Sequence, residues 1–76
     1  MRTARYFDEQ VLRKRPNLRL DWIEQAIARP ARRLIQADGR VRFWASVVTD
    51  DGKAYMLRVV TLEDGETVHN AFFDRD

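Results

Sequence analysis

The sequence predicts an α+β fold, in which two N-terminal helices pack on one face of a four-stranded antiparallel β-meander in the order ααββββ. Two segments with apolar residues at helical spacing come first, and a proline ends each of them. Three Asp-Gly pairs follow at equal spacings of thirteen residues, between runs rich in apolar residues. Because Asp-Gly is among the strongest local signals for a hairpin, three such pairs indicate four consecutive strands.

The two helices are expected at about residues 4–14 and 20–28. The apolar residues that recur at helical spacing in the first are Tyr6, Phe7, Val11 and Leu12. In the second they are Leu20, Ile23 and Ile27, flanked by Trp22 and Ala26. Pro16 and Pro30 end the two segments. Neither helix is long enough to be stable alone, so we expect both to dock on the sheet.

The strands are expected at about residues 32–37, 40–48, 54–61 and 66–73. A three-residue loop, Asp50 to Gly52, gives the second and third of these strands one coherent apolar face. The residues on that face are then Val41, Phe43, Ala45, Val47, Tyr55, Leu57, Val59 and Thr61. The opposite face collects Arg40, Arg42, Trp44, Ser46, Met56, Arg58 and Val60, and it stays open to solvent.

Two registers are compatible with the last strand. A three-residue loop, Glu63 to Gly65, places Asn70 opposite Arg58 and brings His69, Ala71 and Phe73 beside the core. A two-residue loop instead turns Val68, Asn70 and Phe72 inward and exposes His69. Both are chemically tolerable, and the choice between them determines whether His69 is available for chemistry.

Composition excludes several classes of protein. The 76 residues have room for one small domain, residues 1–76. No cysteine is present, which excludes disulfides and a thiolate nucleophile, and a single histidine excludes a histidine-rich metal site. We therefore expect no metal and no cofactor. The longest apolar run, residues 43–48, is too short to span a membrane, and no secretory signal opens the chain. A cytoplasmic protein without membrane contact is expected.

The charge is unevenly distributed along the chain. Residues 1–42 contain eleven Arg or Lys and five Asp or Glu, whereas residues 43–76 contain three and seven. Twelve of the fourteen basic residues are arginine, which suits bidentate contacts to phosphate or carboxylate groups. This asymmetry is typical of nucleic-acid contact or of an acidic partner, and also of ordinary solvated helix surfaces.

Three segments resemble a family of small bacterial domains that is grouped with the RelE/ParE-like and BrnT-like toxins of type II toxin–antitoxin modules. They are WIEQAIARP (residues 22–30), YMLRVVT (55–61) and TVHNAFFDR (67–75). The resemblance runs from about Asn17 to the C-terminus. It implies a RelE/ParE-toxin-like fold and a small cognate antitoxin encoded nearby. In the nuclease branch it implies mRNA cleavage, often on the ribosome, and in the ParE branch a protein target, DNA gyrase.

The residues offer groups for metal-independent RNA cleavage by attack of the 2′-hydroxyl. Such an enzyme must orient the backbone, stabilise a charged phosphorane and move two protons. The candidate catalytic residues are Arg58, His69 and Arg75, with His69 as acid or base and the arginines on the phosphate. The candidate nucleic-acid-binding residues are Arg32, Arg33, Arg40, Arg42 and Trp44, with the indole of Trp44 as a stacking platform.

Each candidate also has a structural interpretation. Arg58 can pair with an acidic side chain on the open face, and His69 can be a hydrogen-bonded sheet histidine. Trp44 can anchor a protein contact, and the arginines around Pro30 can be a solvated helix exit. The alternative to an RelE/BrnT-like endoribonuclease is therefore a non-catalytic protein-interaction module or a homodimer, joined through the open face or an exposed edge strand.

Overall fold

The computed structural model describes residues 1–74, and these form two helices packed on a five-stranded mixed sheet. The helices are η1 (Phe7–Leu12), a single π-helical segment, and α1 (Leu20–Ala28). The strands are β1 (Arg2–Thr3), β2 (Arg32–Ile35), β3 (Val41–Val48), β4 (Ala54–Thr61) and β5 (Thr67–Asp74), in the spatial order β1-β5-β4-β3-β2. The α+β class, the two helical segments and the antiparallel meander from β2 to β5 are as predicted.

The strand order differs from the prediction in one element. A fifth strand, β1, pairs in parallel with β5, with Arg2 opposite Thr67 and Thr3 opposite Val68, so the sheet is mixed and not purely antiparallel. The first helical segment begins near the expected residue 4, because Arg5 and Tyr6 are already helical ahead of η1 and the amide of Asp8 donates to the carbonyl of Ala4 at 3.1 Å. The amide of Ala4 donates to the carbonyl of Val68 at 2.8 Å, which continues the strand connection up to the helix. A two-residue strand carries no alternating pattern that a sequence reading can detect.

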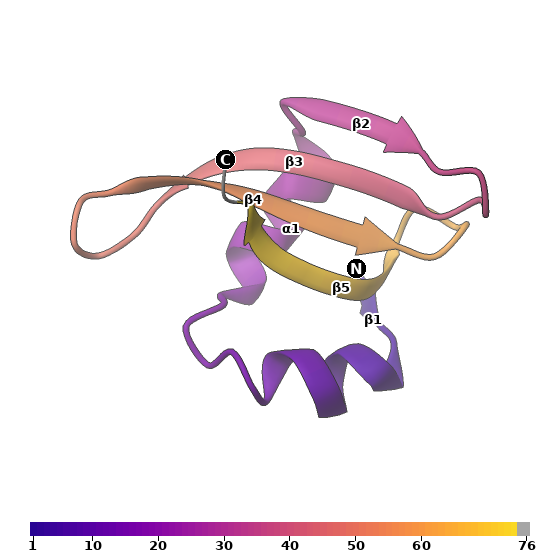
Figure 1. Cartoon of the computed structure of the whole chain (residues 1–76), viewed down its shortest axis with the longest axis horizontal. Helices are drawn as coiled ribbons and strands as arrows, with labels where there is room; N and C mark the ends of the chain where they lie inside the picture. Colours follow the sequence, from indigo (N-terminus) through magenta and orange to yellow (C-terminus); the bar gives the residue numbers. More distant parts are fainter. Residues whose placement is uncertain (75–76) are drawn as a thin grey trace.

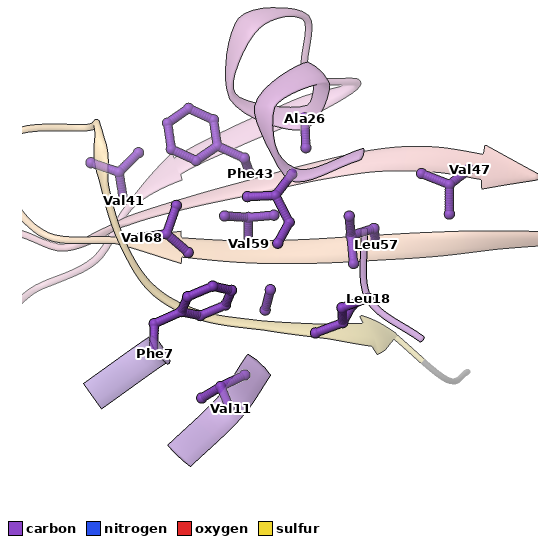
Figure 2. Close-up of a cluster of buried hydrophobic side chains, with 12 residues drawn as sticks. Phe7, Val11, Leu18, Ala26, Val41, Phe43, Val47, Leu57, Val59 and Val68 are labelled. Carbon is purple, nitrogen blue, oxygen red and sulfur yellow. The ribbon is translucent and has the colours of Figure 1, made fainter. Parts of the chain in front are cut away.

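Both helices lie on one side of the sheet (Figure 1). Helix α1 packs against β3 and β4, and η1 packs against β5. The buried apolar side chains between these layers form the core that Figure 2 shows. They are Phe7, Val11, Leu18, Ile23, Ala26, Val41, Phe43, Val47, Leu57, Val59, Val68 and Ala71. The opposite side of the sheet carries no helix, so it is called the open face below.

The register of β3 and β4 confirms the predicted three-residue loop. Val41 lies opposite Thr61, Phe43 opposite Val59 and Ala45 opposite Leu57. The amide of Thr49 donates to the carbonyl of Lys53 at 2.9 Å and closes the loop, and Gly52 has a φ of +81°. Only glycine adopts this backbone conformation without steric cost, which explains why the Asp-Gly signal located the turn correctly.

Neither predicted register holds along the whole of the last strand. The pairing of Thr61 with Val68 is that of the predicted two-residue loop, whereas Ala71 and Phe73 lie on the core side, as the three-residue loop predicts. The loop between β4 and β5 has four residues, 63–66, and is closed by the amide of Leu62 donating to Thr67 at 2.9 Å. Thr61 then lies opposite Val68 but Val60 opposite Asn70, so a β-bulge at His69 shifts the register by one residue. This bulge lets both Val68 and Ala71 reach the core, which no uniform register allows.

Candidate functional site on the open face of the sheet

The open face presents an aromatic and basic surface built by four neighbouring strands. Arg32 on β2 lies opposite Trp44 on β3, and Trp44 lies opposite Arg58 on β4. Arg58 in turn lies opposite Phe72 on β5. Arg32, Trp44, Arg58 and Phe72 therefore form one continuous line across the sheet, which we call the cation–aromatic row.

The side chains of the row are stacked on one another. The guanidinium carbon of Arg32 lies 4.9 Å from the ring centre of Trp44, and that of Arg58 lies 5.7 Å from the same ring. Arg58 also lies 4.7 Å from the ring centre of Phe72. These distances are within the range of cation–π attraction, which contributes about 0.5–1 kcal/mol per pair at exposed sites. The row is thus a preorganised surface whose arginines hold their positions by stacking.

A fifth residue, Arg15, extends the row at its β5 end. Its Nη1 donates to the carbonyl of Ala71 at 2.9 Å, and its guanidinium carbon lies 5.8 Å from the ring centre of Phe72. Arg15 therefore satisfies a backbone acceptor of β5 and adds a positive charge at the same edge. A hollow of about 350 Å³ adjoins it, lined by Arg15, Asn17, Leu18, Phe72 and Phe73.

One carboxylate joins the centre of the row. Asp74 Oδ1 accepts a hydrogen bond from Arg58 Nη2, and Asp74 Oδ2 accepts one from Trp44 Nε1 at 3.3 Å. The two charged side chains are 23% and 27% exposed, so the pair is accessible from solvent. Arg58 Nε is buried and has no hydrogen-bond partner among residues 1–74. The arginine thus has donor capacity that Asp74 does not use.

The other predicted nucleic-acid-binding residues divide between the two sides of the sheet. Arg42 shares the open face and its Nε donates to Gln36 Oε1 at 3.0 Å. Arg40 lies 3.9 Å from the carboxylate of Asp38, at the end of the sheet where the β2–β3 loop lies. Arg33 alternates with Arg32 and points to the helix side, with its guanidinium carbon 5.8 Å from the ring centre of Phe43.

The three predicted catalytic residues are not shown to form one site. His69 occupies the bulge of β5, three residues from Phe72, which is the neighbour of Arg58. Three residues of strand span about 10 Å. Arg75 lies outside the described residues. Of the two predicted catalytic residues that the structure describes, Arg58 lies within the row and His69 does not.

His69 stacks on Tyr6, with ring centres 4.9 Å apart and the ring planes 20° from parallel. Partial burial lowers the pKa of His69 below its usual 6.5, the charge of Arg40 lowers it further, and the charge of Asp38 opposes this. Folding therefore favours the neutral form of this partly buried imidazole.

Sequence reasoning missed three members of this surface: Phe72, Asp74 and Arg15. The predicted three-residue loop also turns Phe72 and Asp74 to the open face, but it pairs Arg58 with Asn70, whereas the bulge at His69 brings Phe72 opposite Arg58. Arg15 reaches the row from the segment between η1 and α1, across a separation of 56 residues in sequence to Ala71. Its approach depends on tertiary packing, and no local pattern in the sequence signals it.

Within the part of the chain that the structure describes, no group of three or more His, Cys, Asp or Glu residues is placed to hold a metal ion. None of the helices over the same residues has the length and apolar character needed to cross a membrane. Comparison of the chain with protein-family models, with curated proteins and with solved structures gave no match.

Proposed function

We propose that the protein binds single-stranded RNA on the open face of its sheet. The observation that carries the proposal is the cation–aromatic row, in which Arg32, Trp44, Arg58 and Phe72 cross four strands in register. Aromatic side chains on a sheet stack with unpaired bases, and neighbouring arginines contact the phosphates. Four strands at a spacing of about 4.8 Å give the row a length of about 14 Å, so it can contact more than one nucleotide.

The balance of charge on this face supports an anionic ligand. Arg32 has no carboxylate within 4.0 Å among residues 1–74, and Arg42 is bound there only to the neutral amide of Gln36. Arg15 adds a third cation at the β5 edge. A strand of RNA that follows the row would neutralise these charges and release counterions, which makes binding salt-dependent.

The fuller form of the proposal is an RelE/BrnT-like endoribonuclease, the toxin of a type II module with a small antitoxin encoded nearby. Attack by the 2′-hydroxyl needs a proton acceptor, a proton donor and a cation at the scissile phosphate. Arg58 suits the last of these roles. The separation of His69 from Arg58 along the sheet supports binding more directly than cleavage, and His69 acts on RNA only if the strand extends along β5 to the bulge.

Binding and cleavage are tested in two steps. Fluorescence anisotropy with a labelled single-stranded oligoribonucleotide should show that Arg58→Ala weakens binding about tenfold, because it removes a phosphate contact and the stacking partner of two rings. Arg5→Ala is the matched control, since the Arg5 side chain is 88% exposed, pairs only with Glu9 within residues 1–74 and lies at the start of the first helix, away from the row. Equal losses in the two variants would contradict a specific site on the open face.

Cleavage is then tested by controlled induction in a bacterium, with growth and RNA 5′ ends followed for the wild type, Arg58→Ala and His69→Ala. Growth arrest with new RNA ends that disappear in either folded variant supports the endoribonuclease. Arrest with intact RNA favours a protein target of the ParE type. Normal growth with intact RNA, together with RNA binding in vitro, limits the function to binding.

A second candidate function, binding to a protein, is favoured by the edge strand β2. All four residues of β2 are exposed, and Leu34 and Ile35 are 43% and 60% exposed. An edge strand with apolar side chains on both faces is a template for pairing with another chain, either an antitoxin or a second copy. A stable complex of defined stoichiometry that is lost on substituting Ile35 by lysine would identify this function.

A further inference from the structure

We propose that Arg58 and Trp44 form a binding site for a phosphodiester group, and that the carboxylate of Asp74 occupies this site in the free protein. The inference rests on the proposed RNA-binding function and adds the specific contact at which a phosphate is bound. It also gives Asp74 a role as an internal competitor of the ligand.

The geometry around Asp74 is that of an anion site. Two donors from neighbouring strands, Arg58 Nη2 and Trp44 Nε1, converge on the two oxygens of one carboxylate. A phosphodiester also presents two charged oxygens on one atom, and arginine binds both kinds of anion through the same planar donors. The donor arrangement that holds Asp74 therefore fits a phosphate of the RNA backbone.

The site has unused capacity for a ligand. Arg58 lies on the strand between those of Trp44 and Phe72, and its guanidinium carbon is 5.7 Å and 4.7 Å from the centres of the two rings. Its Nε is buried and has no partner in the described chain, although an arginine normally binds an anion through two donors. The carboxylate of Asp74 is attached to β5 and cannot adjust its position freely. A phosphate that is not attached to the sheet can accept from Nε as well.

Release of Asp74 requires only a local change. Asp74 is the last residue of β5, and the pair that it forms with Arg58 is about one quarter exposed. An ion pair that keeps this much contact with solvent is easier to open than a fully buried pair. When Asp74 turns away, the positive charges of Arg58 and Arg32 on either side of Trp44 both face the ligand.

The test is the substitution Asp74→Asn, which removes the competing charge and keeps the size of the side chain. We expect about fivefold tighter binding of a labelled single-stranded oligoribonucleotide, because the ligand no longer displaces an ion pair. The matched control is Glu24→Gln, which removes one exposed carboxylate from α1. Equal gains in both variants would assign the effect to net charge and overturn the proposal. Weaker binding by Asp74→Asn would also overturn it.

A second measurement separates this proposal from the RNA-binding function. Inorganic phosphate is titrated into the Asp74→Asn variant while the indole N–H resonance of Trp44 is followed by NMR, with Trp22 as the internal reference. A saturable shift of the Trp44 signal that Arg58→Lys weakens supports the anion site, even if no RNA binds and the proposed function fails. An unchanged Trp44 signal would overturn the site. Binding of an acidic peptide in place of RNA would reassign it to a protein ligand.

Discussion

The two faces of the sheet are made by the same strands but differ in how far their side chains are buried. On β4, Leu57 and Val59 are fully buried beneath α1, whereas the side chain of Arg58 between them is 23% exposed on the open face. On β3, Phe43 is 3% exposed while the neighbouring Trp44 lies in the cation–aromatic row. Alternation along a strand thus separates the residues that stabilise the fold from those available for binding. The comparison predicts which substitutions affect folding and which affect the RNA binding that we propose.

The open face is not simply a solvated surface. Arg32 and Arg58 lie against aromatic rings. Val60 on the same face is only 9% exposed without any helix above it, and its neighbours across the sheet are Arg42 and Asn70. Arginine can cover apolar surface with its side-chain stem while keeping its donors at the edge. The arginines of this face are thus held in place by stacking and still have N–H groups that can donate. A polar surface of this kind differs from a hydrophobic core.

The largest expected effect comes from two neighbouring residues on opposite faces of β4. Leu57→Ala should lower the free energy of unfolding by about 3 kcal/mol, because it leaves a cavity among fully buried side chains. Met56→Ala should change it by less than about 1 kcal/mol, since Met56 is 39% exposed. Urea denaturation followed by circular dichroism measures both values. Similar losses in the two variants would show that the open face is covered in solution.

Arg32 and Arg33 allow the two faces to be compared on β2, because the residues carry the same charge but Arg32 lies on the open face and Arg33 on the helix side. Arg32→Ala should weaken binding of a single-stranded oligoribonucleotide about threefold, because it removes one phosphate contact and its stacking on Trp44. Arg33→Ala should leave binding almost unchanged, since the Arg33 guanidinium lies over Phe43 on the helix side. Anisotropy titrations at two salt concentrations measure the difference. A larger loss for Arg33 would place the binding surface at the β2 edge instead.

The sequence predicted the fold well where two local signals agreed. The Asp-Gly turns and the alternation of β3 and β4 together determined the loop length, the register and the face of Trp44 and Arg58. These signals are local in the chain. A register shifted by one residue would have turned the charged side chain of Arg58 toward the core. Half of the cation–aromatic row was therefore predictable without the structure.

The rest depended on interactions between distant segments. A bulge at His69 lets Val68 and Ala71 both reach the core, and it thereby brings Phe72 opposite Arg58 on the open face. The spacing of residues in β5 does not indicate the extra residue of the bulge. The bulge depends on how η1 and β1 pack on this strand, and both are distant in the sequence. Arg15 joins the site for the same tertiary reason. The strand β1 escaped prediction because two residues carry no periodic pattern.

The smallest expected effect is a pH dependence of stability that arises from His69 at the bulge of β5. Burial lowers the pKa of His69 in the folded protein below its usual 6.5, so the unfolded chain binds the proton more readily. Stability should therefore decrease as pH falls through 6.5 toward the lowered folded pKa, and it should be fully present above 6.5. His69→Asn should remove this slope. Urea denaturation of both proteins between about pH 5 and 8 measures it.

The carboxyl groups with lowered pKa values do not interfere with this measurement. The pKa of Asp64 is lowered to about 2 by hydrogen bonds from Thr67 and Glu66, and that of Asp51 is lowered from 3.8 chiefly by the Thr49 hydroxyl. Their contribution to stability is lost only as pH falls below about 4. Parallel pH profiles for wild type and His69→Asn would mean that His69 is as solvated when folded as when unfolded. The stack on Tyr6 would then not persist in solution, and the imidazole at the bulge would be free to reach RNA bound along β5.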